Sequence, residues 1–121
     1  MDDFTKAYIE CALWSSTDDK GNNLDADHSV EDIAADTLTQ MEADCKDFQQ
    51  ANTALIEEAK TIRTTYDDAH AGHDFWLSRN GHGAGFFDRG LAAAGDDLQL
   101  AAKVYGSQDL CIGDDGMIHS F

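Results

Sequence analysis

Apolar residues recur at helical spacing over much of the chain. From Val30 to Ile62 they repeat at intervals of three, four and seven residues, which is the most regular pattern in the sequence. This pattern predicts one long helix, or two helices with a break near Asn52-Thr53. Residues 4–14 (FTKAYIECALW) have apolar positions closer to a period of 3.6 than to 2. We expect a short helix there, although the run IECALW also suits a strand.

Polar clusters predict the boundaries of these elements. Residues 15–28 (SSTDDKGNNLDADH) consist of turn-forming and acidic residues and predict an exposed loop. Ser29 stands three residues before Asp32, the spacing of a capping box, which predicts that the long helix begins there. A further helix runs from about Tyr66 and stops at Arg79-Asn80-Gly81, since Asn and Gly commonly end helices.

The C-terminal part combines one more helix with a hairpin. Residues 86–105 predict a helix with these side chains inward: Phe86, Phe87, Leu91, Leu98, Ala101, Ala102 and Tyr105. Asp115-Gly116 lies between two short apolar runs, a strong signal for a β-hairpin. We therefore expect a mainly α (α+β) fold, in which residues 1–121 form a single small helical domain with a C-terminal β-hairpin.

Composition narrows the class of protein. The chain is 42% hydrophobic and holds six Phe, three Tyr and two Trp, which argues against intrinsic disorder. No stretch approaches the length of a membrane span, and Met1-Asp2-Asp3 lacks the basic lead of a secretory signal. Three widely spaced cysteines suit a reducing compartment. We expect a cytoplasmic protein, monomeric or homodimeric, without membrane contact.

Charge changes the picture most. The 24 acidic residues and 8 basic residues give a net charge of −16, and residues 1–61 hold 15 of the acids. Direct binding to nucleic acid is excluded by repulsion from the phosphates, whereas a basic groove on another protein would attract this chain. Two simpler explanations stay open: the acids keep a small protein soluble, or they reflect a high-salt cytoplasm.

Candidate chemistry concentrates in AGHDFWLSRNGHGAGFFDRG, residues 71–90. A site in this corner would use His73, Asp74, Trp76, Arg79, Asn80, His82, Phe86, Asp88 and Arg89. The His and Asp residues, with His70, match no metal-ligand spacing, and the glycines match no phosphate-binding loop, so we predict no metal and no cofactor. We favour a structural interpretation, in which Asp74 or Asp88 pairs with Arg79 or Arg89 while Trp76 and Phe86 fill the core. No nucleophile signature is present, and we do not expect an enzyme.

The same stretch resembles a group of short, acidic, uncharacterised proteins of tailed bacteriophages and mobile elements. YIECALWSSTD at 8–18 and GDDG at 113–116 also resemble segments of that group. The resemblance implies a phage-like origin and no particular activity. Small acidic phage proteins often occupy the DNA-binding groove of a host enzyme, which makes DNA mimicry our leading hypothesis.

The mimicry hypothesis has a physical basis. Duplex DNA presents about one negative charge per 1.7 Å of axis, and carboxylates three or four residues apart on a helix are about 5–6 Å apart. Asp32 and Asp36, and Asp44 and Asp47, have such spacings on the predicted long helix. The partner-binding acids would be Asp25, Asp27, Glu31, Asp32, Asp36, Glu42, Asp44, Asp47, Glu57 and Glu58.

Three interpretations of function follow. The leading one is a stoichiometric inhibitor of a host DNA-processing or DNA-binding protein, such as a restriction system, a CRISPR effector or a uracil-DNA glycosylase. The second is a small enzyme or a ligand- or metal-binding module centred on residues 73–89. The third is a non-catalytic structural or regulatory phage protein.

Overall fold

Five helices and a small hairpin make up the computed structural model, which describes all residues from 1 to 121. The helices are α1 (Asp3–Ser15), α2 (Ala35–Ala51), α3 (Thr53–Ile62), α4 (Asp68–Asn80) and α5 (Ala92–Lys103). Three 3₁₀ turns are η1 (Leu24–Ala26), η2 (Val30–Asp32) and η3 (Phe86–Asp88), and the strands are β1 (Leu110–Ile112) and β2 (Ile118–Ser120). The protein is thus a small α+β domain, as the sequence predicts.

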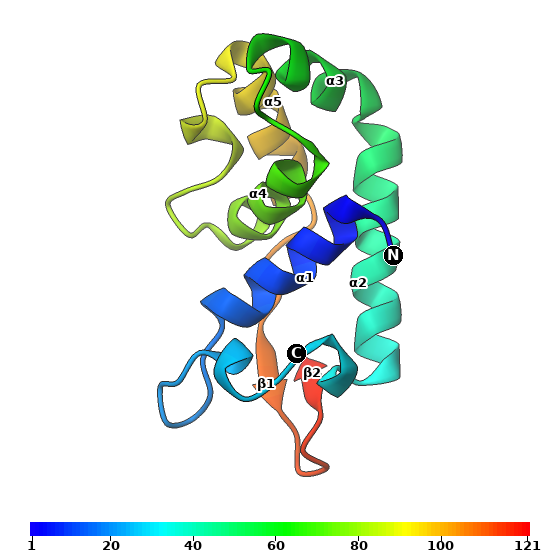
Figure 1. Cartoon of the computed structure of the whole chain (residues 1–121), viewed down its shortest axis with the longest axis vertical. Helices are drawn as coiled ribbons and strands as arrows, with labels where there is room; N and C mark the ends of the chain where they lie inside the picture. Colours follow the sequence, from blue (N-terminus) through cyan, green and yellow to red (C-terminus); the bar gives the residue numbers. More distant parts are fainter.

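Three of the helices gather at one end of the molecule, and the hairpin lies at the other end (Figure 1). In Figure 1, α3, α4 and α5 gather at the upper end, α2 runs along one side, and α1 crosses the middle. The antiparallel hairpin lies at the lower end beside the 3₁₀ turns of the N-terminal half, with Cys111 opposite His119. A parallel bridge between Ile33 and Ile118 joins the two. None of the helices has both the length and the apolar character that crossing a membrane requires.

An aromatic core holds the helices together. One cluster of 24 buried residues extends from Phe4 to Ile118 and draws on all five helices. At its centre Phe48 of α2 stacks on Phe75 of α4, with 4.2 Å between ring centroids, and Phe86 stacks on Phe48 at 5.7 Å. These rings supply a large part of the apolar area that the fold removes from water.

Helix α4 is held at both ends by local signals. The Asp67 carboxylate accepts a hydrogen bond of 2.9 Å from the His70 amide, which caps the first turn. Gly81 ends the helix in the left-handed conformation, with φ +66°, and its amide donates back to the last turn. The helix therefore begins and stops close to where the sequence predicts.

Two predicted boundaries are wrong. The long helix does not begin at Ser29: residues 30–32 form a 3₁₀ turn, the backbone is extended at Ile33, and α2 starts at Ala35. The Ala34 amide donates instead to the carbonyl of Ile118, a long-range bond invisible to local pattern. The predicted break at Asn52, by contrast, is confirmed.

The helix predicted over residues 86–105 is also too long. Residues 86–88 form a 3₁₀ turn, Gly90 and Ala92 have positive φ, and regular helix starts only at Ala92. Phe87, expected inside, is 47% exposed. The positive φ angles interrupt the helix, so that a periodicity read across them places Phe87 on the wrong side.

Candidate functional site

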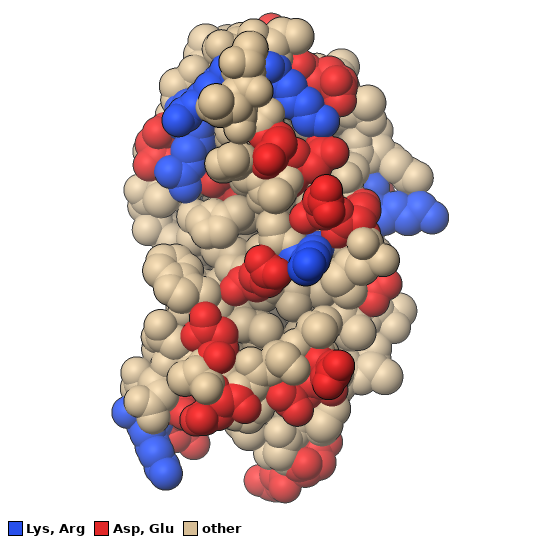
Figure 2. Space-filling view, viewed as in Figure 1, with Lys and Arg blue, Asp and Glu red and all other residues tan.

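Most of the acidic side chains project into solvent without a basic partner. Carboxylates that pair with a Lys or Arg are Asp44, Glu57, Asp68, Asp74 and Asp88. The other nineteen have no Lys or Arg within 4 Å, and twenty of the 24 acidic residues are exposed. Figure 2 shows acids over the middle and lower parts of one face, and several basic side chains near its upper end. The surface is therefore acidic, and Lys or Arg side chains neutralise few of its carboxylates.

The ten acids predicted to bind a partner differ in their surroundings. Asp44 pairs with buried Arg79, and Asp47 accepts a hydrogen bond from the Tyr105 hydroxyl. Asp32 caps η2 by accepting from the Ser29 amide at 2.9 Å. Five of them are exposed and form no side-chain hydrogen bond or Lys/Arg ion pair: Asp25, Asp27, Glu31, Glu42 and Glu58.

The predicted helical pairing of Asp32 with Asp36 is wrong. Asp32 belongs to η2 and Asp36 to the first turn of α2, with extended backbone between them. The spacing of four residues on one helix face therefore does not apply to this pair. On α2 itself the exposed acids are Asp36, Glu42 and Asp47.

The nine residues predicted to form one site at 73–89 lie in different parts of the structure. Trp76 and Phe86 are 1% and 0% exposed, as expected for core residues. Trp76 Nε1 donates to the Ser15 hydroxyl at 2.8 Å. Asn80 accepts from the Gln108 amide at 2.8 Å, and Asp88 accepts from the Gly85 amide at 3.0 Å, so both hold neighbouring backbone in place. His82 is exposed.

Arg79 is a structural cation. Its guanidinium donates to Asp44 at 2.9 Å, to the Tyr8 hydroxyl at 3.0 Å, and to the carbonyls of Gly106 and Tyr105 at 2.8 and 3.0 Å. The side chain is only 6% exposed. It ties α4 to α2 and to the segment after α5, and four of its five N–H donors are engaged within the protein.

Three of the nine corner residues, His73, Asp74 and Arg89, meet at a pocket of about 810 Å³ between α1 and α4. Its other lining residues are Ala7, Glu10, Cys11, Trp14, Asp25, Arg63, Thr65, Tyr66, Asp67, Ala69 and His70. The volume lies in the range of small-ligand sites, roughly 300–1,000 Å³. Packing of α1 on α4 brings together residues more than fifty positions apart in the chain.

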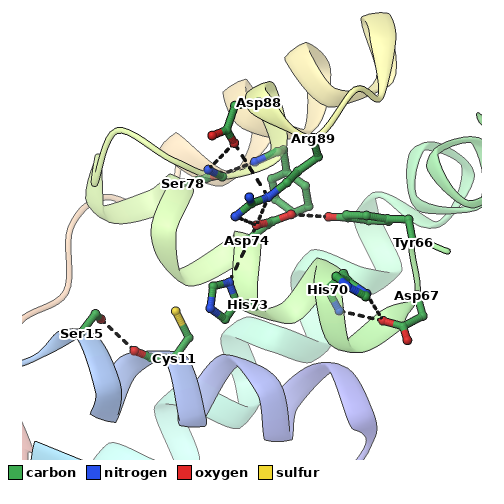
Figure 3. A network of polar contacts seen from close by, with 12 residues as sticks. Cys11, Ser15, Tyr66, Asp67, His70, His73, Asp74, Ser78, Asp88 and Arg89 are labelled. Carbon is green, nitrogen blue, oxygen red and sulfur yellow. Dashed lines mark hydrogen bonds and ion pairs between the residues drawn. The ribbon is translucent and has the colours of Figure 1, made fainter. Parts of the chain in front are cut away.

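The inner wall of this pocket is a satisfied ion-pair network. The Asp74 carboxylate accepts from the Tyr66 hydroxyl at 2.7 Å and from Arg89 Nε at 3.0 Å, and its side chain is 2% exposed. Figure 3 shows Arg89 and Tyr66 reaching Asp74 from two sides, while His73 projects from α4 towards α1. His73 Nδ1 lies 3.9 Å from Asp74, too far for a hydrogen bond. The predicted pairing of Asp74 with Arg89 is confirmed.

The surroundings shift the pKa values of several side chains that line the pocket. Burial raises the pKa of Tyr66, and the adjacent Asp74 carboxylate raises it further, so the hydroxyl stays a donor. Hydrogen bonds from the His70 amide and ring hold the pKa of Asp67 below its usual value. Burial raises the pKa of the Cys11 thiol to about 12. This thiol is therefore protonated at neutral pH and does not supply a thiolate nucleophile beside His73.

The residues that sequence reasoning missed are those contributed by α1 and by the segment before α4, namely Glu10, Trp14, Arg63 and Tyr66. Trp14 is 54% exposed although the three residues before it, Cys11, Ala12 and Leu13, are buried. One signal in the sequence could have indicated this site: an acid and a tryptophan lie four residues apart at the edge of the apolar stripe of the first helix. The described residues contain no group of three or more His, Cys, Asp or Glu side chains placed to hold a metal ion.

The fold and site define a small α+β domain with an acidic surface and a pocket of mixed polarity between α1 and α4. Comparison with protein families, curated proteins and solved structures gives no match to this chain.

Proposed function

We propose that this protein is a stoichiometric inhibitor that imitates duplex DNA and occupies the basic groove of a host nucleic-acid enzyme. The observation that supports it is the set of nineteen carboxylates without a Lys or Arg partner in a chain of net charge −16. A protein that used its acids mainly to form ion pairs would neutralise most of them internally. Here the charge is left free to meet a cationic surface.

The physical consequence is steering. Opposite fields of this size accelerate association and favour a basic partner over neutral surfaces. The same field repels DNA, so the protein and DNA would compete for one groove without contacting each other. The resemblance of residues 71–90 to phage proteins fits this role and extends it to a host cell, with restriction, CRISPR or repair enzymes as the target class.

The structure sharpens the choice of test variant. Asp44 is unsuitable, because its removal would leave the buried Arg79 guanidinium without a counter-ion. We choose instead four exposed acids that hold no side-chain bond, in the variant D27N/E31Q/E42Q/E58Q. Its matched control neutralises four exposed acids outside the predicted set, in the variant D19N/D96N/D97N/D109N. Both variants have the same net charge.

The experiment is affinity capture from bacterial lysate at low and high salt, followed by an activity assay of each captured enzyme. We expect a DNA-processing enzyme that is released by excess duplex DNA or by salt and is inhibited at a one-to-one ratio. The first variant should lose capture and the control should retain most of it. Capture that duplex DNA does not displace, or that both variants retain equally, would contradict mimicry.

A further inference from the structure

The pocket between α1 and α4 contains carboxylates that form no hydrogen bond or ion pair with other side chains. Its lining has four acids, Glu10, Asp25, Asp67 and Asp74, against two arginines, Arg63 and Arg89. Asp74 is neutralised by Arg89, whereas Glu10 and Asp25 form no side-chain hydrogen bond and no ion pair. Arg63 has no acidic partner either, and its guanidinium donates to the carbonyl of Arg89. Three carboxylates without a Lys or Arg partner (Glu10, Asp25 and Asp67) thus outnumber one unpaired arginine, and within an already negative molecule this excess favours a positively charged occupant.

An exposed indole lies beside these acids. Trp14 is 54% exposed and lines the pocket, while the other tryptophan, Trp76, is 1% exposed. Glu10 and Trp14 are four residues apart in α1 and so lie on the same side of that helix. The face of an indole attracts cations more strongly than any other side-chain ring, and arginine is its most frequent partner. An indole flanked by free carboxylates is a site for an organic cation.

A planar cation fits better than a compact one. A guanidinium can lie flat on the indole while its donors reach carboxylates at the edge, which an ammonium does less well. The volume of about 810 Å³ is more than one side chain needs and leaves room for the adjoining backbone. The pair of buried Asp74 and half-buried Arg89 forms a fixed wall rather than a competitor, because the two groups already bind each other.

We infer that this pocket takes an arginine side chain of the partner protein, and so provides the anchor for docking. The identity of the partner rests on the proposed function, but the chemistry of the pocket does not. An acidic surface alone gives fast, weakly specific association, and specific complexes depend on a few buried anchors, among which arginine is frequent. A DNA-binding groove is rich in arginine, so one such side chain inserted between α1 and α4 would fix the orientation of the complex.

The test uses the isolated protein and a small probe. N-acetyl-arginine amide is titrated into the ¹⁵N-labelled protein, with N-acetyl-citrulline amide as the neutral analogue of the same shape. We expect amide shifts confined to the pocket segments of α1 and α4, and quenching of Trp14 fluorescence. The dissociation constant should be about millimolar for a ligand of this size. The citrulline probe should bind about ten-fold more weakly, since it lacks the charge.

Variants with matched controls separate the site from general charge. E10Q and W14L should each weaken arginine binding about five-fold or more. D97N removes one exposed, unpaired acid outside the predicted binding set, and F87L removes a similarly exposed ring elsewhere, so both should bind as the wild type does. Denaturant unfolding confirms that each variant is folded before titration.

Three results would overturn the inference. The first is that no amide of the pocket shifts at probe concentrations up to 50-fold the expected dissociation constant. The second is equal binding of the arginine and citrulline probes. The third is tighter binding of spermidine, which would indicate a site for free polyamines. Failure here is distinguishable from failure of the proposed function. If the arginine probe binds but lysate capture yields no partner that DNA displaces, the arginine site is supported and DNA mimicry is contradicted. If capture succeeds and the substitutions E10Q and W14L leave it unchanged, DNA mimicry is supported and the role of the pocket as an anchor is contradicted.

Discussion

At the scale of the residue, the cation at Arg79 shows how a chemically suggestive side chain can serve the fold. Four hydrogen bonds surround its guanidinium, and aromatic rings lie about it, with Phe75 at 5.8 Å and Tyr105 at 5.7 Å from its central carbon. Only one acid, Asp44, neutralises it. A buried guanidinium is tolerated because every side of it has a partner, so the loss of one partner is costly.

Removal of that acid should therefore destabilise the protein. The substitution D44A leaves a nearly buried charge with only neutral acceptors, and we expect a loss of about 2–3 kcal/mol in the free energy of unfolding. The control E42A removes an exposed, unpaired acid of the same helix and should change stability by less than about 0.5 kcal/mol. Urea unfolding followed by circular dichroism measures both. Equal stability of the two variants would show that the pair contributes little.

Only part of the site is predictable from the sequence at this scale. Asp74 and Arg89 are fifteen residues apart, and their pairing was foreseeable from their place at one corner of two elements. The partnership of Arg79 with Asp44 was not, because it depends on how α2 packs against α4 over a separation of 35 residues. Trp14 is the last residue of the apolar run 4–14 that predicts α1. A helical projection places it beside Glu10 at the edge of the apolar stripe, which is where the structure exposes it.

At the scale of the element, the crossing of α1 and α4 both builds the core and creates the pocket. The two helices are in close contact at Gly72, where an added Cβ would lie 1.9 Å from the carbonyl oxygen of Phe4. Backbone atoms cannot move aside as a flexible side chain can. Gly72 therefore allows the close approach of the two helices, and with it the geometry of the groove that Glu10 and Trp14 share with His73.

The substitution G72A tests this crossing by the sign of its effect. Inside a helix, Gly→Ala normally stabilises by up to about 1 kcal/mol. We expect G72A to destabilise by about 3 kcal/mol or more, or to prevent folding, since the helices would have to separate. G106A is the control: φ there is +73° but an added Cβ meets nothing within 4 Å, so it should cost only about 1 kcal/mol. A stabilised G72A protein would refute the close approach.

The elements that the sequence predicted correctly are those with a local cause. The break at Asn52, the stop at Gly81 and the hairpin turn at Gly116 each depend on residues within a few positions of the boundary. The errors have distant causes. Residues 33–34 are extended because they pair with Ile118, some 85 positions away, so the cap at Ser29 initiates only one 3₁₀ turn.

At the scale of the whole molecule, the acidic field has a cost in stability. Sixteen uncompensated negative charges on 121 residues repel one another in the compact state more than in the unfolded chain. The acids are concentrated in the N-terminal half, and in Figure 2 most of the charged side chains in the middle and lower parts of the visible face are acidic. If this field serves recognition of a basic groove, the protein tolerates the repulsion at ordinary ionic strength.

Salt dependence distinguishes a recognition surface from adaptation to a salty cytoplasm. Repulsion between exposed charges is screened over a Debye length of about 10 Å at 0.1 M salt and about 3 Å at 1 M. For the proposed mimic we expect the Tm to rise as NaCl increases from 10 mM, most steeply below about 0.3 M, and then to level off because screening is nearly complete. The variant D27N/E31Q/E42Q/E58Q should start at a higher Tm and rise less, since it has fewer charges to screen. Calorimetry at stepwise NaCl measures both curves. A protein that is unfolded at low salt and gains stability up to molar concentrations would instead be one adapted to high salinity, and the acids would then need no partner to explain them.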